Sequence, residues 1–298
     1  RLNKMAVTAK LVKELRDLTA AGMMDCKKAL EATDGDIKKA VDWLRENGLA
    51  KAAKKEGRIA AEGLGKIAID GNKAVIIEVN SETDFVAKNE KFLELLDVVA
   101  NTILASDAKT NEEALALTTA DGTLNDTFIN AVATIGEKIT LRRFEIVSKN
   151  DDEFFGSYTH QGGRIVALTV VKGGDAQVAK NMAMQIASMN PTYVSRNDMP
   201  QDVVEHERSI QEELLAKDEK LASKPEKVKA GIIEGRVSKS LQDMCLVDQE
   251  YFLDADQKCG QYLKSNNAEV LSFVKYVVGE GIEKKEENFA AEVAAMAK

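Results

Sequence analysis

Apolar residues in the first fifty positions recur at helical spacing in three short runs. The first run places Leu11, Val12, Leu15 and Leu18 on one face, and a second helix is expected over 24–30. Asp34-Gly35-Asp36 ends that helix and starts a third, with Asp36 as its N-cap. We therefore predict a three-helix module with its linker at 5–57. Its small core suits docking better than an active site.

The pattern then changes to short strands followed by a long helix. Ile67–Ile69 and Ala74–Val79 flank Asp70-Gly71-Asn72, which predicts a β-hairpin. An amphipathic helix is expected from about Phe85 to Ala105, and a strand from Ile139 to Val147. Between these two elements, residues 106–137 give only weak signals for helix and loop.

The same order of elements recurs farther along the chain. Phe155–Tyr158 and Arg164–Val171 flank Thr159–Gly163, and helical spacing follows over 178–186. This weak internal repeat predicts two similar α+β core subdomains. We place the first at 58–146 and the second at 147–199 together with 241–280, where a strand is expected at Val270–Val278.

Residues 200–240 differ in character, because their apolar positions fall near heptad spacing in two runs. The runs are Val203, Ile210, Leu214 and Leu221, then Val228, Ile232, Val237 and Leu241. Ser223-Lys224-Pro225 separates them, and Pro225 suits a first helical position. We predict an antiparallel, coiled-coil-like helical hairpin inserted into the second subdomain. The fold class is therefore α+β.

The two ends of the chain are treated separately. An amphipathic C-terminal helix is expected over 281–298, with Phe289, Val293 and Met296 on its apolar face. Arg1–Lys4 precede Met5 and are expected to be vector-derived or to reflect an alternative start. We leave these four residues out of the predicted fold.

Charge and cysteine usage exclude several classes of protein. The net charge is −8 and the sequence pI about 5.1, which argues against a general DNA or RNA binder. No apolar run approaches the roughly 20 residues that span a bilayer. Three cysteines without CxxC spacing suggest the reducing cytoplasm. We therefore expect a cytoplasmic protein that does not cross a membrane.

Motifs for nucleotide, metal or catalytic chemistry fail on context. Gly63–Ala68 spells GxGxxA, but it leads into the hairpin rather than from a strand into a helix. Gly65-Lys66 lacks the other residues of a phosphate-binding P-loop. A pairing of Cys26 with His160 has no local support, and His206 is expected to be solvated. We predict no catalytic residue, no cofactor, no metal site and no direct nucleotide binding.

Two segments resemble the elongation factor Ts family in detail. They are Leu15-Arg16-Asp17-Leu18-Thr19-Ala20-Ala21-Gly22-Met23-Met24-Asp25-Cys26-Lys27-Lys28-Ala29-Leu30 and Glu78-Val79-Asn80-Ser81-Glu82-Thr83-Asp84-Phe85-Val86-Ala87-Lys88. Two tail segments resemble the family as well: Val278-Gly279-Glu280-Gly281-Ile282-Glu283 and Phe289-Ala290-Ala291-Glu292-Val293. The sequence departs from it at Ala20, where a glycine is common, and at 248–253, which lacks the usual prolines. Because of the second departure, we do not count Phe252 and Leu253 among the expected partner contacts.

The resemblance implies a fold and a function. It implies a UBA-like N-terminal module and a guanine-nucleotide exchange factor for the GTPase elongation factor Tu, without a covalent step. Residues 83–86 (Thr83, Asp84, Phe85 and Val86) would bind the partner, with Asp84 and Phe85 entering near its magnesium and phosphate site. Arg16, Met23 and Met24 would contact the same GTPase domain. His160 would reach a second domain of the partner.

Each of these residues also has an ordinary structural interpretation. Ser81 to Asp84 fits a capping box at the head of the long helix, with Phe85 in the core. Met23 and Met24 fit core positions, and His160 fits an exposed turn. Two other functions stay open: a polypeptide-binding scaffold or holdase, and a cysteine hydrolase using Cys26. The oligomeric state is open too, with a homodimer or a 2:2 complex among the alternatives.

Overall fold

The computed structural model describes residues 7–19 and 21–283 of the chain. The fold is α+β, as the sequence predicts, and it divides into two compact units. Unit 1 takes the chain up to Val147 together with Gly162–Arg164 and the residues from Tyr276 on. Unit 2 contains Ser148–Gln161 and Ile165–Lys275. The predicted C-terminal helix beyond residue 283 and the first four residues lie outside the described part.

Three helices open unit 1: α1 (Ala9–Thr19), α2 (Met23–Ala32) and α3 (Ile37–Ala53). The Asp36 side chain accepts a hydrogen bond from the Lys39 backbone N–H at 3.1 Å, which confirms the predicted N-cap. The helices share a small core of Val12, Leu15, Cys26, Ala29, Leu30 and Ala40. Leu18 was predicted on the same face as Leu15, but 59% of it is exposed. Leu18 therefore keeps the spacing of this face but is not part of the core, and it lies one residue before the end of α1 at Thr19.

The sheet of unit 1 has the strand order β1-β2-β5. The hairpin strands β1 (Glu62–Asp70) and β2 (Lys73–Ser81) pair antiparallel around the Gly71-Asn72 turn, and β5 covers Thr140–Ser148. Helix α4 (Glu90–Leu104) packs on the hairpin, and α6 (Leu124–Ile135) packs against α4, with the apolar faces of both helices in one core with the strands. The shorter elements of this unit are η1 (Val86–Lys88), α5 (Asn111–Leu115), β3 (Thr118–Thr119) and β4 (Gly122–Thr123).

A buried carboxylate lies in the middle strand of this sheet. The Glu78 side chain is fully buried, and Arg142 and Arg143 reach it at 3.0 and 2.6 Å. The Gly279 backbone N–H donates to the same carboxylate at 2.9 Å, and Asn80 donates at 3.1 Å. Burial, the largest single effect, raises its pKa, but these hydrogen bonds and the arginine charges together leave the pKa of Glu78 lowered. Residues more than 200 positions apart are thus joined by one ionised group.

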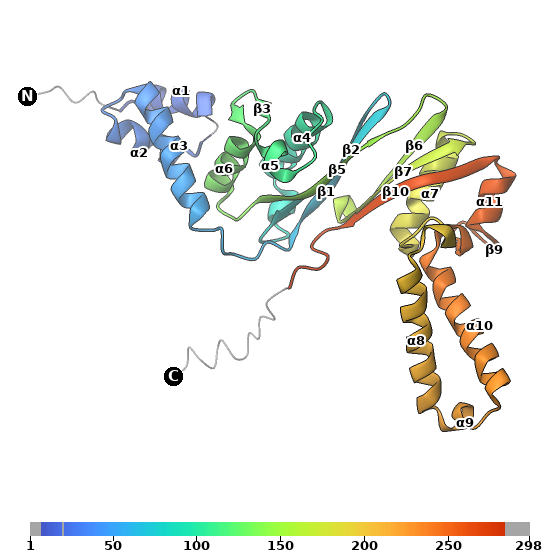
Figure 1. The fold of residues 1–298 in the computed structure, drawn as a ribbon. Helices are drawn as coiled ribbons and strands as arrows, with labels where there is room; N and C mark the ends of the chain where they lie inside the picture. Colours follow the sequence, from blue (N-terminus) through green and yellow to red (C-terminus); the bar gives the residue numbers. More distant parts are fainter. Residues whose placement is uncertain (1–6, 20, 284–298) are drawn as a thin grey trace, which may run out of the picture. The chain divides into compact units, whose positions relative to one another are not determined.

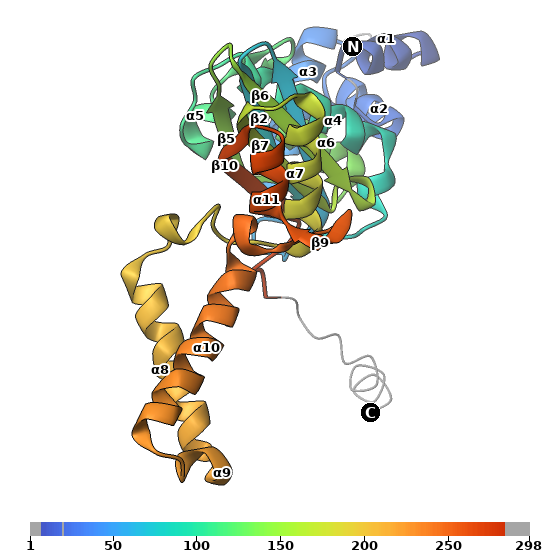
Figure 2. The same cartoon turned by 90° about the vertical axis from the view of Figure 1, so that its right-hand side faces the viewer.

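Unit 2 repeats the plan of that sheet. Its strands are β6 (Glu153–His160), β7 (Ile165–Gly173) and β10 (Ala268–Val277), in the order β10-β7-β6. Helix α7 (Ala176–Met189) follows β7 and packs across the hairpin, as Figure 2 shows. The remaining elements of unit 2 include η3 (Arg196–Asp198), η4 (Leu246–Asp248), β8 (Glu250–Tyr251), β9 (Asp254–Lys258) and α11 (Cys259–Ser265). The short helix η2 (Gln161–Gly163) begins in unit 2 and continues into unit 1.

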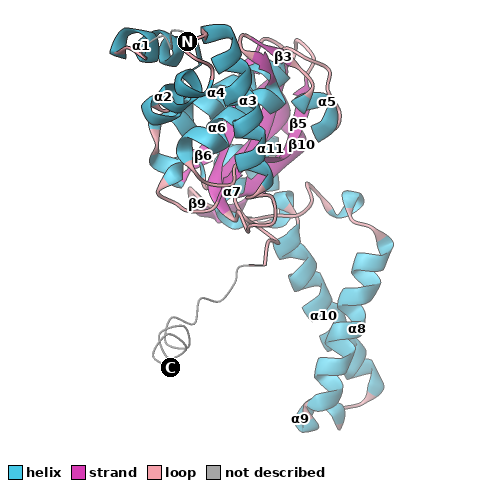
Figure 3. Cartoon of the chain, turned by 90° about the vertical axis from the view of Figure 1, so that its left-hand side faces the viewer, coloured by secondary structure: helices cyan, strands magenta, loops and turns pink. Residues whose placement is uncertain are grey.

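A long helical hairpin interrupts unit 2 between α7 and β10. Helices α8 (Gln201–Lys217) and α10 (Glu226–Met244) lie side by side, with α9 (Glu219–Ala222) at their far end (Figure 1). Figure 3 shows this segment as helices joined by short loops. Pro225 is the N-cap of α10 rather than its first helical residue. The predicted heptad register is also displaced, because Leu215 is buried whereas Leu214 is 50% exposed.

The base of the hairpin is closed by backbone hydrogen bonds. The N–H groups of Thr192 and Tyr193 donate to the Met244 carbonyl at 2.9 and 3.0 Å, and Leu246 N–H donates to the Tyr193 carbonyl at 2.9 Å. The two ends of the insertion are therefore adjacent. In the part of the chain that the structure describes, no helix is long and apolar enough to cross a membrane.

Candidate partner-binding site

The connection from β2 to α4, Glu82–Asn89, presents the most exposed large apolar side chain of the described residues. Phe85 is 79% exposed. Asp84 beside it is also exposed, and within the described residues no hydrogen bond or ion pair engages its carboxylate. The two residues form a turn that leads into η1. A wedge-shaped aromatic ring and an unpartnered carboxylate thus stand side by side on the surface.

The predicted capping box does not form. Asn89 is the N-cap of α4, and its side chain accepts from the Lys91 backbone N–H at 2.9 Å. The Ser81 hydroxyl instead donates to the Thr83 carbonyl at 3.0 Å. The long helix begins at Glu90, five residues later than predicted, because Asn89 offers a cap directly before its apolar stripe. Phe85 is not a core residue, so both ordinary interpretations of this segment are wrong.

Backbone contacts hold the start of this turn. The Glu137 carboxylate accepts hydrogen bonds from the N–H groups of Glu82 and Thr83 at 3.1 and 2.9 Å, and from the Thr83 hydroxyl at 2.6 Å. Val86, at the other end of the turn, is buried in the core of unit 1. Asp84 and Phe85 are therefore exposed between two fixed points. Sequence reasoning did not find Glu137, since 54 residues separate it from Thr83.

A second apolar surface lies at the turn between α1 and α2. Met23 and Met24 are 59% and 64% exposed, so their interpretation as core methionines is wrong. Leu18 is also exposed and lines a cavity with residues of α3 and α6, and Arg16 lies exposed in the last turn of α1. Methionine packs adaptably, which suits a docking surface. Sequence reasoning placed Leu18 on the buried face of the first helix, whereas the structure leaves it exposed.

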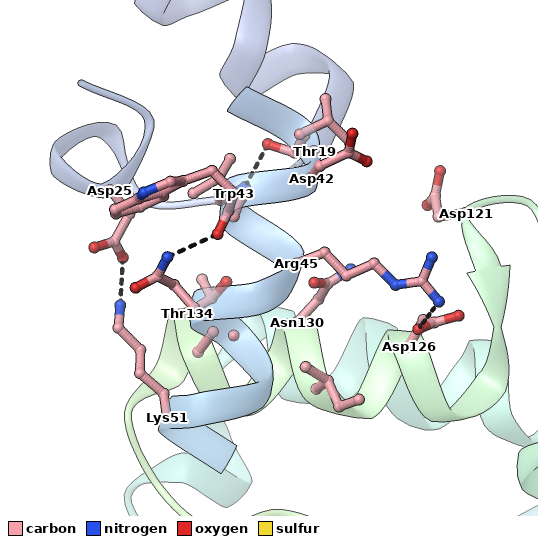
Figure 4. A pocket seen from close by; sticks show the side chains of 18 of the residues that line it. Thr19, Asp25, Asp42, Trp43, Arg45, Lys51, Asp121, Asp126, Asn130 and Thr134 are labelled. Atoms are coloured by element: carbon pink, nitrogen blue, oxygen red, sulfur yellow. Dashed lines mark hydrogen bonds and ion pairs between the residues drawn. The ribbon is translucent and has the colours of Figure 1, made fainter. Parts of the chain in front are cut away.

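Helix α3 packs against α6 within unit 1 (Figure 4). A Cβ atom at Gly48 would meet the Ile129 side chain at 3.3 Å, so glycine allows the close approach of the two helices. Arg45 pairs with Asp126 at 3.1 Å, and Lys51 pairs with Asp25 at 2.9 Å. These ion pairs line a cavity of about 510 Å³ beside the helices.

His160 ends β6 in unit 2. It is partly buried, and its Nδ1 lies 3.2 Å from the Tyr158 hydroxyl. Its neighbour Gln161 has φ 48° and Gly162 has φ 66°, which produces the tight turn into β7. The histidine is thus fixed at the end of a strand beside an exposed turn.

The three cysteine side chains are buried. Burial raises the pKa values of the Cys26 and Cys245 thiols, and it raises that of Cys259 to about 12. A buried, protonated thiol is a poor nucleophile, which disfavours the cysteine hydrolase. The described residues contain no group of three or more His, Cys, Asp or Glu side chains that could hold a metal ion. Gly63–Ala68 lies within β1, which is not the context of a dinucleotide-binding loop.

Comparisons with known proteins give a consistent result. The family model for "Elongation factor TS" matches residues 82–280. A relative named Elongation factor Ts, from Acholeplasma laidlawii (strain PG-8A), is 51% identical over 292 residues, which cover 98% of this chain and 99% of the relative. The chain belongs to the elongation factor Ts family. Membership in the elongation factor Ts family assigns it to translation elongation. The match includes the turn at Asp84 and Phe85 as well as Glu137.

Proposed function

We propose that this chain is a guanine-nucleotide exchange factor for elongation factor Tu, in which Asp84 and Phe85 loosen bound GDP. The observation that carries the proposal is the exposure of Phe85 beside an unpartnered carboxylate on an anchored turn. Burying a phenylalanine side chain contributes about 1.5–3 kcal/mol to folding. Phe85 gives up most of that contribution, so its exposure serves a partner rather than the fold.

The proposed mechanism follows from the chemistry of the partner's nucleotide site. Phosphates in such sites are held by backbone N–H groups, a lysine and Mg²⁺. Phe85 wedges partner side chains apart, and the Asp84 carboxylate competes for groups that hold the metal. Both effects weaken phosphate binding without a covalent step. The anchored turn keeps the pair in position before binding, which limits the entropy lost on association.

Other residues supply docking energy in this proposal. Met23, Met24 and Leu18 bury apolar area against the GTPase domain that Asp84 and Phe85 enter, and Arg16 orients that face. His160 contacts a second domain of the partner. Thr83 and Val86 stay in the proposed partner-binding segment, and they also hold the turn, since the hydroxyl of Thr83 is engaged by Glu137 and Val86 is buried.

The domain map and the setting belong to the same proposal. We assign docking to 5–57, exchange to 58–146, the second subdomain to 147–199 with 241–280, and the hairpin to 200–240. The protein would act in the cytoplasm without binding nucleotide itself. Sedimentation of the free chain and of its complex would distinguish a monomer from a homodimer or a 2:2 assembly.

The deciding experiment measures release of fluorescently labelled GDP from elongation factor Tu, with and without this protein. Accelerated release supports the proposal. Calorimetric titration should also show tighter binding to nucleotide-free partner than to GDP-loaded partner, because binding of GDP and of the exchange factor are reciprocally coupled. Equal affinity for both forms would rule out exchange by coupling. That result would favour the alternative of a polypeptide-binding scaffold or holdase.

A further inference from the structure

We infer that Glu137 is a positioning residue for exchange, which fixes the turn that presents Asp84 and Phe85. This inference rests on the proposed function. Glu137 lies between α6 and β5 and does not belong to the turn it holds. Its two carboxylate oxygens accept three hydrogen bonds from Glu82 and Thr83, at 3.1, 2.9 and 2.6 Å.

The contact is reciprocal, which makes it a clasp between two segments. While Glu137 accepts from the backbone of residues 82 and 83, the Glu82 carboxylate accepts from the Lys138 backbone N–H at 2.6 Å. Arg58 also approaches the Glu82 carboxylate at 3.3 Å. Each segment therefore supplies one carboxylate and at least one backbone donor to the other. Charge-assisted bonds of this kind are roughly twice as strong as neutral ones.

The local backbone around Glu137 orients its side chain toward the turn. Gly136 is the C-cap of α6 and has φ 90°, a left-handed conformation that reverses the chain directly before Glu137. The Lys138 ammonium donates to the Arg58 carbonyl at 2.9 Å, which fixes the residue that follows. Glu137 is half-buried, so water competes only in part for its oxygens. The geometry leaves its carboxylate committed to residues 82 and 83.

The clasp acts on the position of Asp84 and Phe85 and not on their chemistry. The Glu137 bonds end one residue before Asp84, and the buried Val86 fixes the chain one residue after Phe85. Without the clasp, the turn keeps its C-terminal anchor, the Ser81–Thr83 contact and the ion pair of Glu82 with Arg58, and no contact from the described residues holds the backbone N–H groups of Glu82 and Thr83. Its exposed pair would then sample many orientations, and binding would have to select the productive one.

The test compares Glu137→Gln with a matched control, Glu153→Gln. Glu153 also uses its carboxylate to hold a turn, accepting two bonds from Asn150 at 2.8 Å, but it lies in unit 2. At saturating exchange factor, labelled GDP should leave elongation factor Tu about tenfold more slowly with E137Q than with wild type, because a displacement of about 1 Å in a positioned group can cost up to about a hundredfold in rate. E153Q should match the wild type. Thr83→Val, which removes only the hydroxyl bond, should cost less than E137Q.

A second arm measures positioning directly. Hydrogen exchange of the Glu82 and Thr83 amides should accelerate at least about tenfold in E137Q but not in E153Q. In the Asp84→Ala, Phe85→Ala background, adding E137Q should slow release no further, since nothing remains to be positioned. Full additivity in that background would overturn a positioning role, and so would wild-type amide exchange in E137Q.

The two proposals fail in different ways. If the wild-type protein does not accelerate GDP release, the proposed function fails, and the role of Glu137 in exchange fails with it. If wild type is active, D84A/F85A is inactive and E137Q equals E153Q, only the role of Glu137 is wrong. Thermal unfolding of each variant verifies that activity is compared among folded proteins. If E137Q does not fold, T83V carries the same comparison through the hydroxyl bond.

Discussion

The two sheets share one plan and differ in how the middle strand continues. Each is a hairpin, a helix and a third strand that pairs with the second hairpin strand. In unit 2 the step from β7 to α7 takes two residues, Gly174 and Asp175, and Asp175 caps the helix directly. In unit 1 the equivalent step from β2 to α4 takes eight residues, Glu82–Asn89. The short version shows that the connection itself needs few residues, so the long one has another use.

The middle strands differ in their chemistry as well. Each buries a polar residue that faces a glycine across the hairpin: Glu78 opposite Gly65 in unit 1, and Thr169 opposite Gly156 in unit 2. The Thr169 hydroxyl donates to the Ala179 carbonyl at 3.0 Å and carries no charge. The buried Glu78 carboxylate, in contrast, is charged and is balanced by Arg142 and Arg143. The contribution of this buried residue to stability therefore depends on pH in unit 1 and not in unit 2.

Substitution of Glu78 should give the largest effect, a loss of stability of unit 1. Glu78→Ala leaves Arg142 and Arg143 without their carboxylate and should destabilise unit 1 by about 3 kcal/mol. Thr169→Ala should cost about 1 kcal/mol. Because the folded-state pKa of Glu78 is lowered, its contribution is present above the unfolded pKa of about 4.3 and is lost as pH falls through the folded value. Chemical denaturation at pH 7 and at several acidic pH values measures both effects. Equal acid sensitivity of wild type and E78A would contradict the assignment.

The two connections should respond oppositely to substitution. Asp84→Ala with Phe85→Ala should slow stimulated GDP release at least about tenfold, or roughly 1.4 kcal/mol, with little loss of stability because both side chains are exposed. Asp175→Ala should cost about 1 kcal/mol of stability through its lost cap and leave release unchanged. Release kinetics and thermal unfolding of both variants test this. Full activity in a folded D84A/F85A variant would remove the proposed site.

Exposed methionines offer a similar pair. Met23→Ser with Met24→Ser should weaken binding to nucleotide-free elongation factor Tu about fivefold, or roughly 1 kcal/mol. Met189→Ser, at the exposed end of α7 in unit 2, is the control and should leave the affinity unchanged. Calorimetry measures both. An equal loss in the two variants would show that the α1–α2 surface has no special part in docking.

The helical hairpin should give the smallest effect on exchange. Its ends meet through the bonds between Tyr193 and Leu246, so a short flexible linker can replace 201–240. Stimulated GDP release should stay within about twofold of wild type, since Asp84 and Phe85 lie in unit 1. The replacement removes Val237, which packs with Met199, Leu241 and Cys245, so stability should fall modestly. Collapse of the remaining protein, seen by circular dichroism, would show that the hairpin belongs to the core of unit 2.

Local turn chemistry made much of the fold predictable. Asp70-Gly71-Asn72 and Asp36 determine a hairpin and a helix start from neighbouring residues alone, and both form as predicted. Helix α6 was not resolved from the sequence, although Thr123 and Asp126 form a capping box that could have located it. The capping prediction at Ser81 failed because Asn89 competes for the same helix. Local signals say that a cap is possible but not which of two candidates is used.

The candidate site was less accessible to local reasoning. By pattern alone, Phe85, Met23 and Met24 are ordinary core residues, and only the family resemblance indicated that they face a partner. The structure shows all three exposed. Leu18 and Glu137 were missed for different reasons. Leu18 keeps the period of a buried face but lies where no helix covers it, whereas the role of Glu137 depends on a contact across 54 positions.

The bond from Gly279 to Glu78 spans 201 positions and has a consequence for synthesis of the chain. A chain grows from its N-terminus, and domains generally fold as they emerge. The strands of the first sheet are complete once Ser148 has been made, yet the carboxylate at its centre still lacks one donor. That donor arrives only after all of unit 2 has been synthesised. The first sheet thus reaches its final stability near the end of translation. Nascent chains truncated before Gly279 should therefore carry a first sheet that lacks this hydrogen bond and is more easily disrupted by acid.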